Sequence, residues 1–134
     1  MRHLLVLPVL CTALAACATP GAPPGAQSGP QAFTLEPGQQ VEAAPGVTLA
    51  FDSVDDSRCP PGVRCVWAGR LIYRFSIGRA GSTVETFTLS PGTPGATPAV
   101  LAGRRVVLDE SSVPAPAAQG AVVHHRIRLT LPPA

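Results

Sequence analysis

Residues 55–69 read DDSRCPPGVRCVWAG and join two segments in which large apolar residues recur at every second position. The first segment covers residues 47–52 and the second covers residues 71–77. Alternation with a period of two predicts β-strands that bury one face. We therefore expect residues 55–69 to form the connection between two strands, and the rest of the chain to support it.

Further strand-like segments occur at residues 33–35, 83–89, 104–108 and 121–131. Clusters rich in Pro and Gly separate them, and we expect the segment 90–99 to be an exposed, mobile loop. No helical periodicity is present. Six or seven short strands without crossover helices predict an antiparallel β-sandwich, immunoglobulin-like in our interpretation, or a small barrel.

The amino terminus has the parts of a secretory signal: a basic start at Arg2, an apolar run too short to cross a bilayer, and small residues before Cys17. The sequence Leu-Ala-Ala-Cys at 14–17 matches the lipobox of bacterial lipoproteins, which implies cleavage after residue 16 and acylation of Cys17. The alternative is an ordinary signal peptide with a chance cysteine. Ala18 resembles the residue that directs such proteins to the outer membrane, so we expect a lipid anchor there, on the periplasmic face.

Residues 17–32 contain mostly Pro, Gly, Ala and Gln, with no large aliphatic or aromatic side chain. Such a segment cannot bury enough apolar surface to fold, which predicts a disordered tether before a β-rich domain at 33–134. Without residues 1–16 the chain carries nine arginines and eight carboxylates, a net charge of about +1. This balance gives no electrostatic reason to expect nucleic-acid binding.

Cys59 and Cys65 remain as an even pair in the predicted exported domain, which favours a disulfide. Between them, Pro61 and Gly62 favour a type II turn, because Pro fixes a negative φ and Gly accepts a positive one. Closing so short a loop contributes only about 2 kcal/mol. The bridge is therefore expected to shape the loop more than to stabilise the fold.

Trp67, the single tryptophan, lies two residues after Cys65. In an extended segment it would share a face with Cys65 and pack against the disulfide, and this shielded structural cluster is the interpretation we favour. The functional alternative is a rigid, exposed binding loop that presents Arg58, Val63, Arg64 and Trp67, because Trp and Arg are enriched at binding hot spots.

Asp52, Asp55 and Asp56 offer oxygen ligands of the kind that calcium prefers. Their spacing does not match the EF-hand loop, and Arg58 and Arg64 are near enough in sequence to neutralise them. We expect solvated charges or local ion pairs here instead of a metal site.

His124 and His125 are adjacent, so on a strand their side chains point to opposite faces and cannot share a metal. His125 follows the apolar face that includes Ile127 and is expected to be a core or edge histidine. His124 is expected to point outward with Arg126 and Arg128. Zinc needs about four ligands, and no further ones are evident.

No catalytic signature is present in the sequence. It contains no G-x-S-x-G, no H-E-x-x-H and no glycine-rich phosphate loop. Catalytic dithiols usually have two residues between the cysteines, whereas five separate Cys59 from Cys65. These patterns favour a binding module over an enzyme, and we expect no cofactor.

The segment DSRCPPGVRCVWAG resembles the signature of small bacterial lipoproteins of unknown function. In that family a lipobox and a spacer precede one β-rich domain with a D-S-R-C-P-x-x-x-x-C-x-W-x-G core. The resemblance covers roughly residues 33–131. It implies a disulfide between Cys59 and Cys65 and an envelope location, and it carries no known activity or binding residues.

Taken together, these features predict a lipid-anchored envelope protein with a non-catalytic domain that binds a protein or a glycan. The alternatives are an inhibitor of an envelope hydrolase, which would use the disulfide-closed turn, and a redox or metal-dependent enzyme. The expected partners are the membrane, through the lipid on Cys17, and an envelope protein or glycan, but no nucleic acid.

Overall fold

The computed structural model describes residues 29–133 of the chain. Within these residues the chain forms seven β-strands and two short 3-10 helices. In order, they are β1 (Gln31–Leu35), β2 (Gln40–Ala44), β3 (Val47–Asp56), β4 (Leu71–Arg79), β5 (Ser82–Leu89), η1 (Ala99–Leu101), β6 (Val107–Asp109), η2 (Glu110–Ser112) and β7 (Ile127–Leu131).

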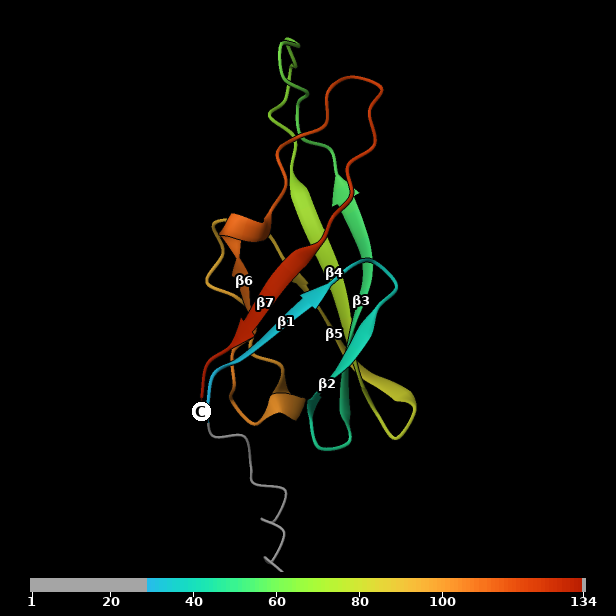
Figure 1. The fold of residues 1–134 in the computed structure, drawn as a ribbon, viewed down its shortest axis with the longest axis vertical. Coiled ribbons are helices and arrows are strands. Elements are labelled where there is room, and N and C mark those ends of the chain that lie inside the picture. The colour runs from blue at the N-terminus through green and yellow to red at the C-terminus, as the bar shows by residue number, and fades with distance from the viewer. Residues whose placement is uncertain (1–28, 134) are drawn as a thin grey trace, which may run out of the picture.

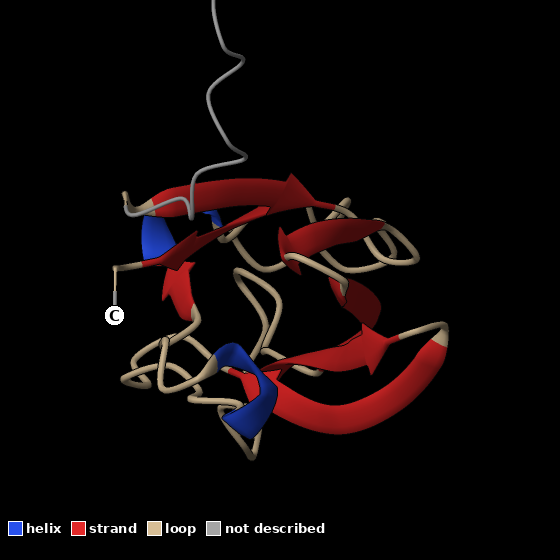
Figure 2. Cartoon of the chain, turned by 90° about the horizontal axis from the view of Figure 1, so that it is seen from below, coloured by secondary structure: helices blue, strands red, loops and turns tan. Residues whose placement is uncertain are grey.

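The strands form two antiparallel sheets, one with the order β1-β7-β6 and one with the order β2-β3-β4-β5 (Figure 1). Viewed along the long axis of the domain, the strands lie on opposite sides of a central core (Figure 2). The predicted all-β sandwich is therefore confirmed. β1 begins two residues before the predicted domain boundary at residue 33.

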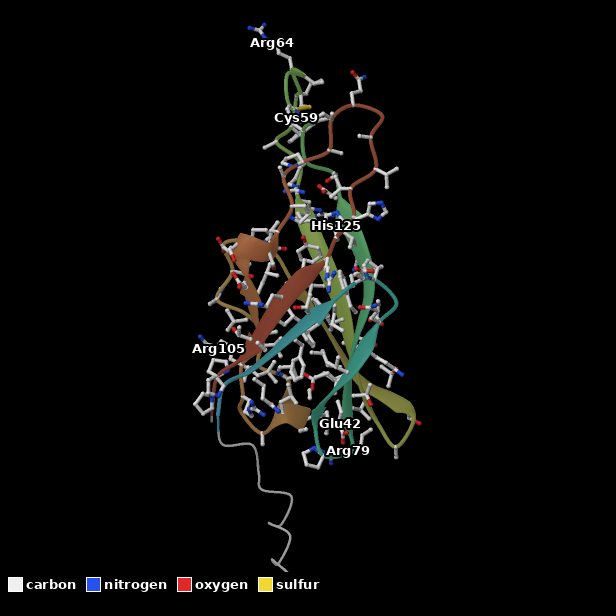
Figure 3. The ribbon with its side chains drawn as sticks, in the orientation of Figure 1. Glu42, Cys59, Arg64, Arg79, Arg105 and His125 are labelled. Atoms are coloured by element: carbon white, nitrogen blue, oxygen red, sulfur yellow. A yellow bond between two sulfur atoms is a disulfide. The ribbon has the colours of Figure 1, made fainter. Side chains whose placement is uncertain are left out.

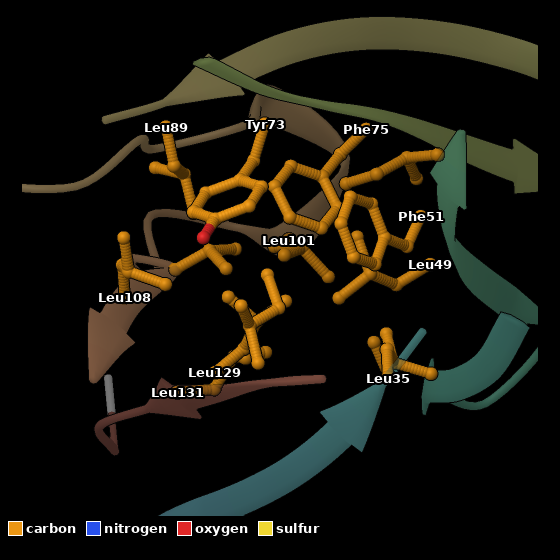
Figure 4. Close-up of a cluster of buried hydrophobic side chains, with 14 of the residues drawn as sticks. Leu35, Leu49, Phe51, Tyr73, Phe75, Leu89, Leu101, Leu108, Leu129 and Leu131 are labelled. Carbon is orange, nitrogen blue, oxygen red and sulfur yellow. The ribbon is translucent and has the colours of Figure 1, made fainter. Parts of the chain in front are cut away.

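The core is built from the alternating apolar residues of both sheets, as the period of two predicts. Phe51 on β3 stacks on Phe75 of β4 with ring centroids 5.0 Å apart, and Tyr73 meets Phe51 edge-on at 5.6 Å. Leu129 and Leu131 close the core from β7 (Figure 4). Because these side chains are fully buried, the two sheets hold together mainly by apolar burial.

β2 was not predicted, because its sequence, QVEAA, is poor in the β-branched and aromatic residues that favour strands. It forms because the Pro45–Gly46 turn folds it back onto β3, with Ala44 opposite Val47. Gly46 has φ +69°, a conformation that glycine adopts readily.

The last strand is shorter than predicted: β7 covers Ile127–Leu131, whereas residues 121–126 form an irregular loop. On one side β7 pairs with β1, whose last residue, Leu35, lies opposite Ile127. On the other side its pairing with β6 ends at Arg128. Residues 121–126 therefore have no neighbouring strand to pair with, although their sequence alternates.

The segment 90–99 is packed more closely than predicted. Ala96 exchanges two backbone hydrogen bonds with Val106, at 2.9 and 2.7 Å, and Pro98 is buried. The Gly92 N–H donates to Glu110 at 2.6 Å. Val106 forms an isolated bridge with Ala96, and the strand predicted at 104–108 begins only at Val107.

The predicted signal peptide, the lipidated Cys17 and most of the tether lie outside the described residues. Between residues 29 and 133 no helix is long and apolar enough to cross a membrane.

Candidate functional site

The connection between β3 and β4, residues 57–70, projects from one end of the sandwich, and we call it the arm (Figure 1). It contains most of the stretch DDSRCPPGVRCVWAG at residues 55–69. In Figure 3, Arg64 lies at its tip and points away from the domain. The arm therefore presents its central residues beyond the ends of the strands.

Hydrogen bonds between its two sides hold the base of the arm. The Ser57 N–H donates to the Arg70 carbonyl at 2.9 Å, and the Arg70 N–H donates to the Ser57 hydroxyl oxygen at 3.1 Å. One step further out, the Cys59 N–H donates to the Ala68 carbonyl at 3.2 Å. The arm thus continues the pairing of β3 with β4 beyond the sheet.

A disulfide and a turn close the outer part of the arm. Cys59 and Cys65 are bonded, with their Cα atoms 5.9 Å apart, as predicted. The Val63 N–H donates to the Pro60 carbonyl at 3.3 Å, and Gly62 has φ +76°. These are features of a type II turn, so the turn predicted from Pro-Gly is confirmed.

Gly69 is required by the geometry of the base. It has φ +71°, and a β-carbon at this position would overlap the backbone of Ser57 and Arg58. Only glycine fits such a close approach of two backbones without a shift. The last glycine of the stretch is therefore a structural part of the arm.

The large apolar side chains of the outer arm are exposed. Val66 is 93% exposed, Trp67 82% and Val63 39%. The favoured interpretation, in which Trp67 shields the disulfide in a structural cluster, is wrong, because residues 63–70 are not an extended strand and Trp67 faces solvent. The alternative, an exposed turn, describes the arm correctly.

Arg58 has a different role from the one predicted for the binding loop. Its guanidinium donates to both carboxylate oxygens of Asp56, at 2.8 and 2.7 Å, and to the Pro114 carbonyl at 2.9 Å. The side chains of Arg58 and Asp56 are each only 18% exposed. Arg58 therefore fastens the arm to the loop before β7, and Val63, Arg64 and Trp67 are the members of the predicted set that face solvent.

The same carboxylate lies near a buried histidine. Nε2 of His125 is 3.5 Å from Asp56 Oδ2, and its Nδ1 is 3.1 Å from the Tyr73 hydroxyl oxygen. A neutral imidazole protonated on Nε2 fits both neighbours, with Tyr73 donating to Nδ1. The predicted core position of His125 is confirmed, since it is 8% exposed.

Burial sets the protonation of this cluster. It raises the pKa of Tyr73 to about 12 and lowers the pKa of His125 below its ordinary value, against the opposing effect of Asp56. Hydrogen bonds from Arg58 lower the pKa of Asp56. At neutral pH the phenol and imidazole are therefore neutral, and the ion pair is confined to Asp56 and Arg58.

A groove of about 860 Å³ lies beside the base of the arm. Its first wall is the outer half of β3, residues 52–54 with Asp56, and Arg58 of the arm. Its second wall is the loop before β7, residues 117–121 and 123–125. Pro60 of the arm also lines the groove, whereas Val63, Arg64, Val66 and Trp67 do not.

The other candidate ligands do not converge. Among the described residues no three His, Cys, Asp or Glu side chains form a group that could hold a metal ion. Asp52 accepts a hydrogen bond from Ser76 at 2.8 Å, and Asp56 pairs with Arg58, which agrees with the predicted local ion pairs. His124 is exposed, as predicted. Within residues 29–133, Arg64 pairs with no carboxylate.

Val66, the most exposed of these apolar side chains, was not predicted as a binding residue, and neither was the link from the arm through Asp56 to His125. Asp56 ends β3 and His125 lies in the loop before β7, and nothing in the local sequence relates them. The only sequence signal for this link was the D-S-R motif, because its Asp56 and Arg58 pair in the structure. Comparisons with protein-family models, with curated proteins and with solved structures gave no match for this chain.

Proposed function

We propose that this protein is a lipid-anchored bacterial envelope protein whose domain binds a partner protein through the tip of the arm. The observation that carries the proposal is the exposure of Val66 and Trp67 on a loop that a disulfide and Gly69 hold in shape. A protein partner would cover these side chains and the Arg64 guanidinium beside them. Tryptophan and arginine are the residue types that contribute most at protein interfaces.

The contrast with the remaining apolar residues supports this role. Among the described residues the exposed large hydrophobic side chains are five, and Val63, Val66 and Trp67 all belong to the arm. The other two, Val84 and Val122, lie on β5 and in the loop before β7. An exposed apolar cluster on a rigid projection costs little entropy when it binds, because the loop is already ordered.

The position of the arm also suits a tethered protein. β1 begins at the end of the sandwich opposite the arm (Figure 1). If Cys17 carries lipid, the tether would reach the domain at that end and leave the arm directed away from the membrane. A module with this arrangement can reach a partner in the periplasm.

The buried cluster supports binding over catalysis at this end of the domain. Tyr73, His125 and Asp56 form a chain of polar contacts, but the Tyr73 hydroxyl is buried and has a raised pKa of about 12. A buried, protonated phenol is a poor nucleophile and a poor base. The chain instead positions the base of the arm.

Inhibition of an envelope hydrolase is a second candidate function, which the shape of the arm favours. A narrow, disulfide-closed turn with Gly62 at its bend is suited to entering the cleft of an enzyme. In that case the bound partner would be a hydrolase and its activity would fall when the domain is added. Otherwise the two candidates use the same residues.

The test is crosslinking in the native envelope. A photo-reactive phenylalanine analogue replaces Val66, the mature chain from Cys17 onward is crosslinked in living cells, and the products are identified by mass spectrometry. The same analogue at Val84, which is 51% exposed on β5, is the matched control. We expect one protein to be crosslinked from position 66 and not from position 84.

Two pairs of variants then separate recognition from general surface effects. Trp67→Ala is compared with Val84→Ala, and Arg64→Ala with Arg79→Ala, since Arg79 lies at the opposite end of the domain (Figure 3). We expect a loss of crosslinking of tenfold or more in the arm variants only. Equal crosslinking in all four variants, or the same proteins from positions 66 and 84, would refute the proposal.

A further inference from the structure

The outer half of β3 has a strand on only one side. β3 has ten residues, and its pairing with β2 reaches Ala50. The segment before β2 continues this pairing to Phe51, whose N–H donates to the Gln39 carbonyl at 2.9 Å. From Ser53 to Asp56, β3 pairs with β4 alone among the described strands, and Asp52 lies in the bulge of that pairing. This leaves residues 52–56 as an open sheet edge, the kind of edge to which other chains can pair.

The direction of the backbone groups on this edge follows from the hydrogen bonds at its ends. The Ser57 N–H points to β4, where it donates to the Arg70 carbonyl. In an antiparallel ladder successive residues direct their N–H and C=O groups to opposite sides, so those of Val54 and Asp56 point away from β4. The Phe51 N–H also points away from β4, to Gln39, although an unbroken alternation counted from Ser57 would direct it toward β4. The bulge between Phe51 and Ser53 causes this reversal.

The groove runs along this open edge. Asp52, Ser53, Val54 and Asp56 all line it. Because the backbone groups of Val54 and Asp56 point away from β4, we expect them to be directed toward this space. In the second wall, residues 117–121 are three alanines, a glutamine and a glycine, and residues 123–125 are a valine and two histidines. Small side chains on that wall leave room for the side chains of an added strand.

The charges of the groove indicate what kind of strand would fit. Its lining includes three carboxylates, on Glu36, Asp52 and Asp56, and one guanidinium, on Arg58, which is already bound to Asp56. Glu36 forms a long, exposed ion pair with Arg126 at 3.9 Å, so Asp52 is the lining carboxylate that pairs with no arginine among the described residues. The described residues as a whole have a slight excess of arginine over carboxylates. A second copy of β3 would bring carboxylates opposite carboxylates, which is unfavourable. A strand with lysine or arginine would complement them.

We propose that this groove binds an extended, basic peptide segment of a partner protein, which pairs with residues 52–56 as an additional strand of the four-stranded sheet. Main-chain hydrogen bonds to Val54 and Asp56 would supply affinity, and Glu36 and Asp52 would select basic side chains. This site goes beyond the proposed function, since it uses no residue of the arm tip.

The test begins with a random dodecapeptide library displayed on phage and selected on the immobilised mature chain. We expect enrichment of peptides with lysine or arginine at alternate positions. The best synthetic peptide is then titrated against Val54→Pro, which removes the edge-facing N–H, and Val54→Ala, which keeps it. We expect the dissociation constant to rise at least tenfold for Val54→Pro and less than threefold for Val54→Ala.

A second measurement does not depend on the folding of the proline variant. Two N-methylated forms of the peptide are made. One carries methyl groups on the odd-numbered amides, and the other carries them on the even-numbered amides. A strand that pairs through one edge should lose binding at least tenfold in one form and retain it in the other. Glu36→Gln combined with Asp52→Asn should weaken the unmethylated peptide at least threefold, whereas Trp67→Ala should leave it unchanged.

Several results would overturn the inference. Selection that enriches no basic peptide, or equal loss of binding in both methylated forms, would exclude pairing along this edge. A chain that dimerises without peptide and becomes monomeric as Val54→Pro would show that a second copy occupies the edge. A peptide that Trp67→Ala abolishes would belong to the arm tip instead.

Discussion

Gly69 lies so close to Ser57 that a β-carbon at position 69 would overlap the Ser57 carbonyl oxygen. We predict that Gly69→Ala lowers the free energy of unfolding by at least about 2 kcal/mol, because the positive φ and the overlap with backbone atoms both oppose the side chain. Gly62→Ala is the control, since Gly62 has a similar φ but open space around it. It should cost about 1 kcal/mol. Equal losses in urea unfolding would contradict this account of the arm base.

Removal of the Tyr73 hydroxyl should destabilise the domain. In Tyr73→Phe the aromatic packing on Phe51 is preserved, but Nδ1 of His125 loses its 3.1 Å partner inside the protein. A buried acceptor left without a donor costs about 1–3 kcal/mol. A hydroxyl added by Phe75→Tyr would not restore this hydrogen bond, because the ring of Phe75 packs against the rings of Phe51 and Phe87. Chemical unfolding monitored by circular dichroism measures the loss, and an unchanged midpoint would mean that water replaces the hydroxyl.

Stability should fall on mild acidification because of His125. Its pKa is lowered in the folded protein by burial, which outweighs the Asp56 carboxylate, and Arg58 adds to the lowering. The unfolded chain therefore binds a proton near pH 6.5 that the folded protein does not bind. The free energy of unfolding should decrease as the pH falls from about 7.5 through 6.5 toward the folded pKa, and show no slope from His125 above that range.

The histidine at position 124 provides the control for that titration. We expect the pH slope to be lost in His125→Gln and retained in His124→Gln, because only His125 is buried. Asp56 acts in a separate range: its folded pKa lies below 3.8, so the stability it contributes is lost only as the pH falls further, through that lowered value. A slope retained in His125→Gln would assign the effect to other groups.

Loss of the disulfide should affect the arm more than the fold. Cys59→Ser combined with Cys65→Ser opens a loop of only a few residues, so we expect the free energy of unfolding to fall by about 2 kcal/mol. Crosslinking from position 66 should fall at least tenfold, since the tip would no longer be held. Denaturant unfolding and crosslinking measure the two effects. A domain that no longer folds would show that the bridge stabilises the whole sandwich.

Arg58 and Arg64 should differ sharply although both belong to the same motif. Arg58→Ala removes three hydrogen bonds to Asp56 and Pro114 and leaves a mostly covered carboxylate unpaired, which should cost about 2 kcal/mol. Arg64→Ala should change stability by less than about 0.5 kcal/mol, since its side chain is exposed. Thermal unfolding of the two variants compares them directly.

Much of the architecture could be predicted from local pattern. The strands around Phe51 and Phe75 follow a strict alternation, and the sandwich follows from several such strands without helices. The Cys59–Cys65 bridge and the turn at Gly62 depend on residues only a few positions apart, so the sequence carries the whole of their geometry. These predictions needed no knowledge of distant contacts.

One incorrect prediction depended on neighbours that are remote in sequence, and another on the local conformation of the arm. The strand expected from residue 121 has the right alternation, but β1 ends at Leu35 and offers no partner beyond Ile127. Trp67 was expected to pack on the disulfide, which requires an extended segment that the arm does not form. The contact between Asp56 and His125 joins the end of β3 to the loop before β7, and no local pattern reports it.

The order of the strands determines when the domain can be completed. β7 is the middle strand of the β1-β7-β6 sheet, so the first and the sixth strands both pair with the last. Gln31 lies opposite Leu131, about a hundred residues later in the chain. The β2-β3-β4-β5 sheet, with its consecutive hairpins, can form while the chain is still emerging, whereas β1 must remain unpaired until residues 127–131 arrive. Folding is therefore expected to finish only after residues 127–131 are available, and removal of β7 should leave two strands of this sheet without their partner.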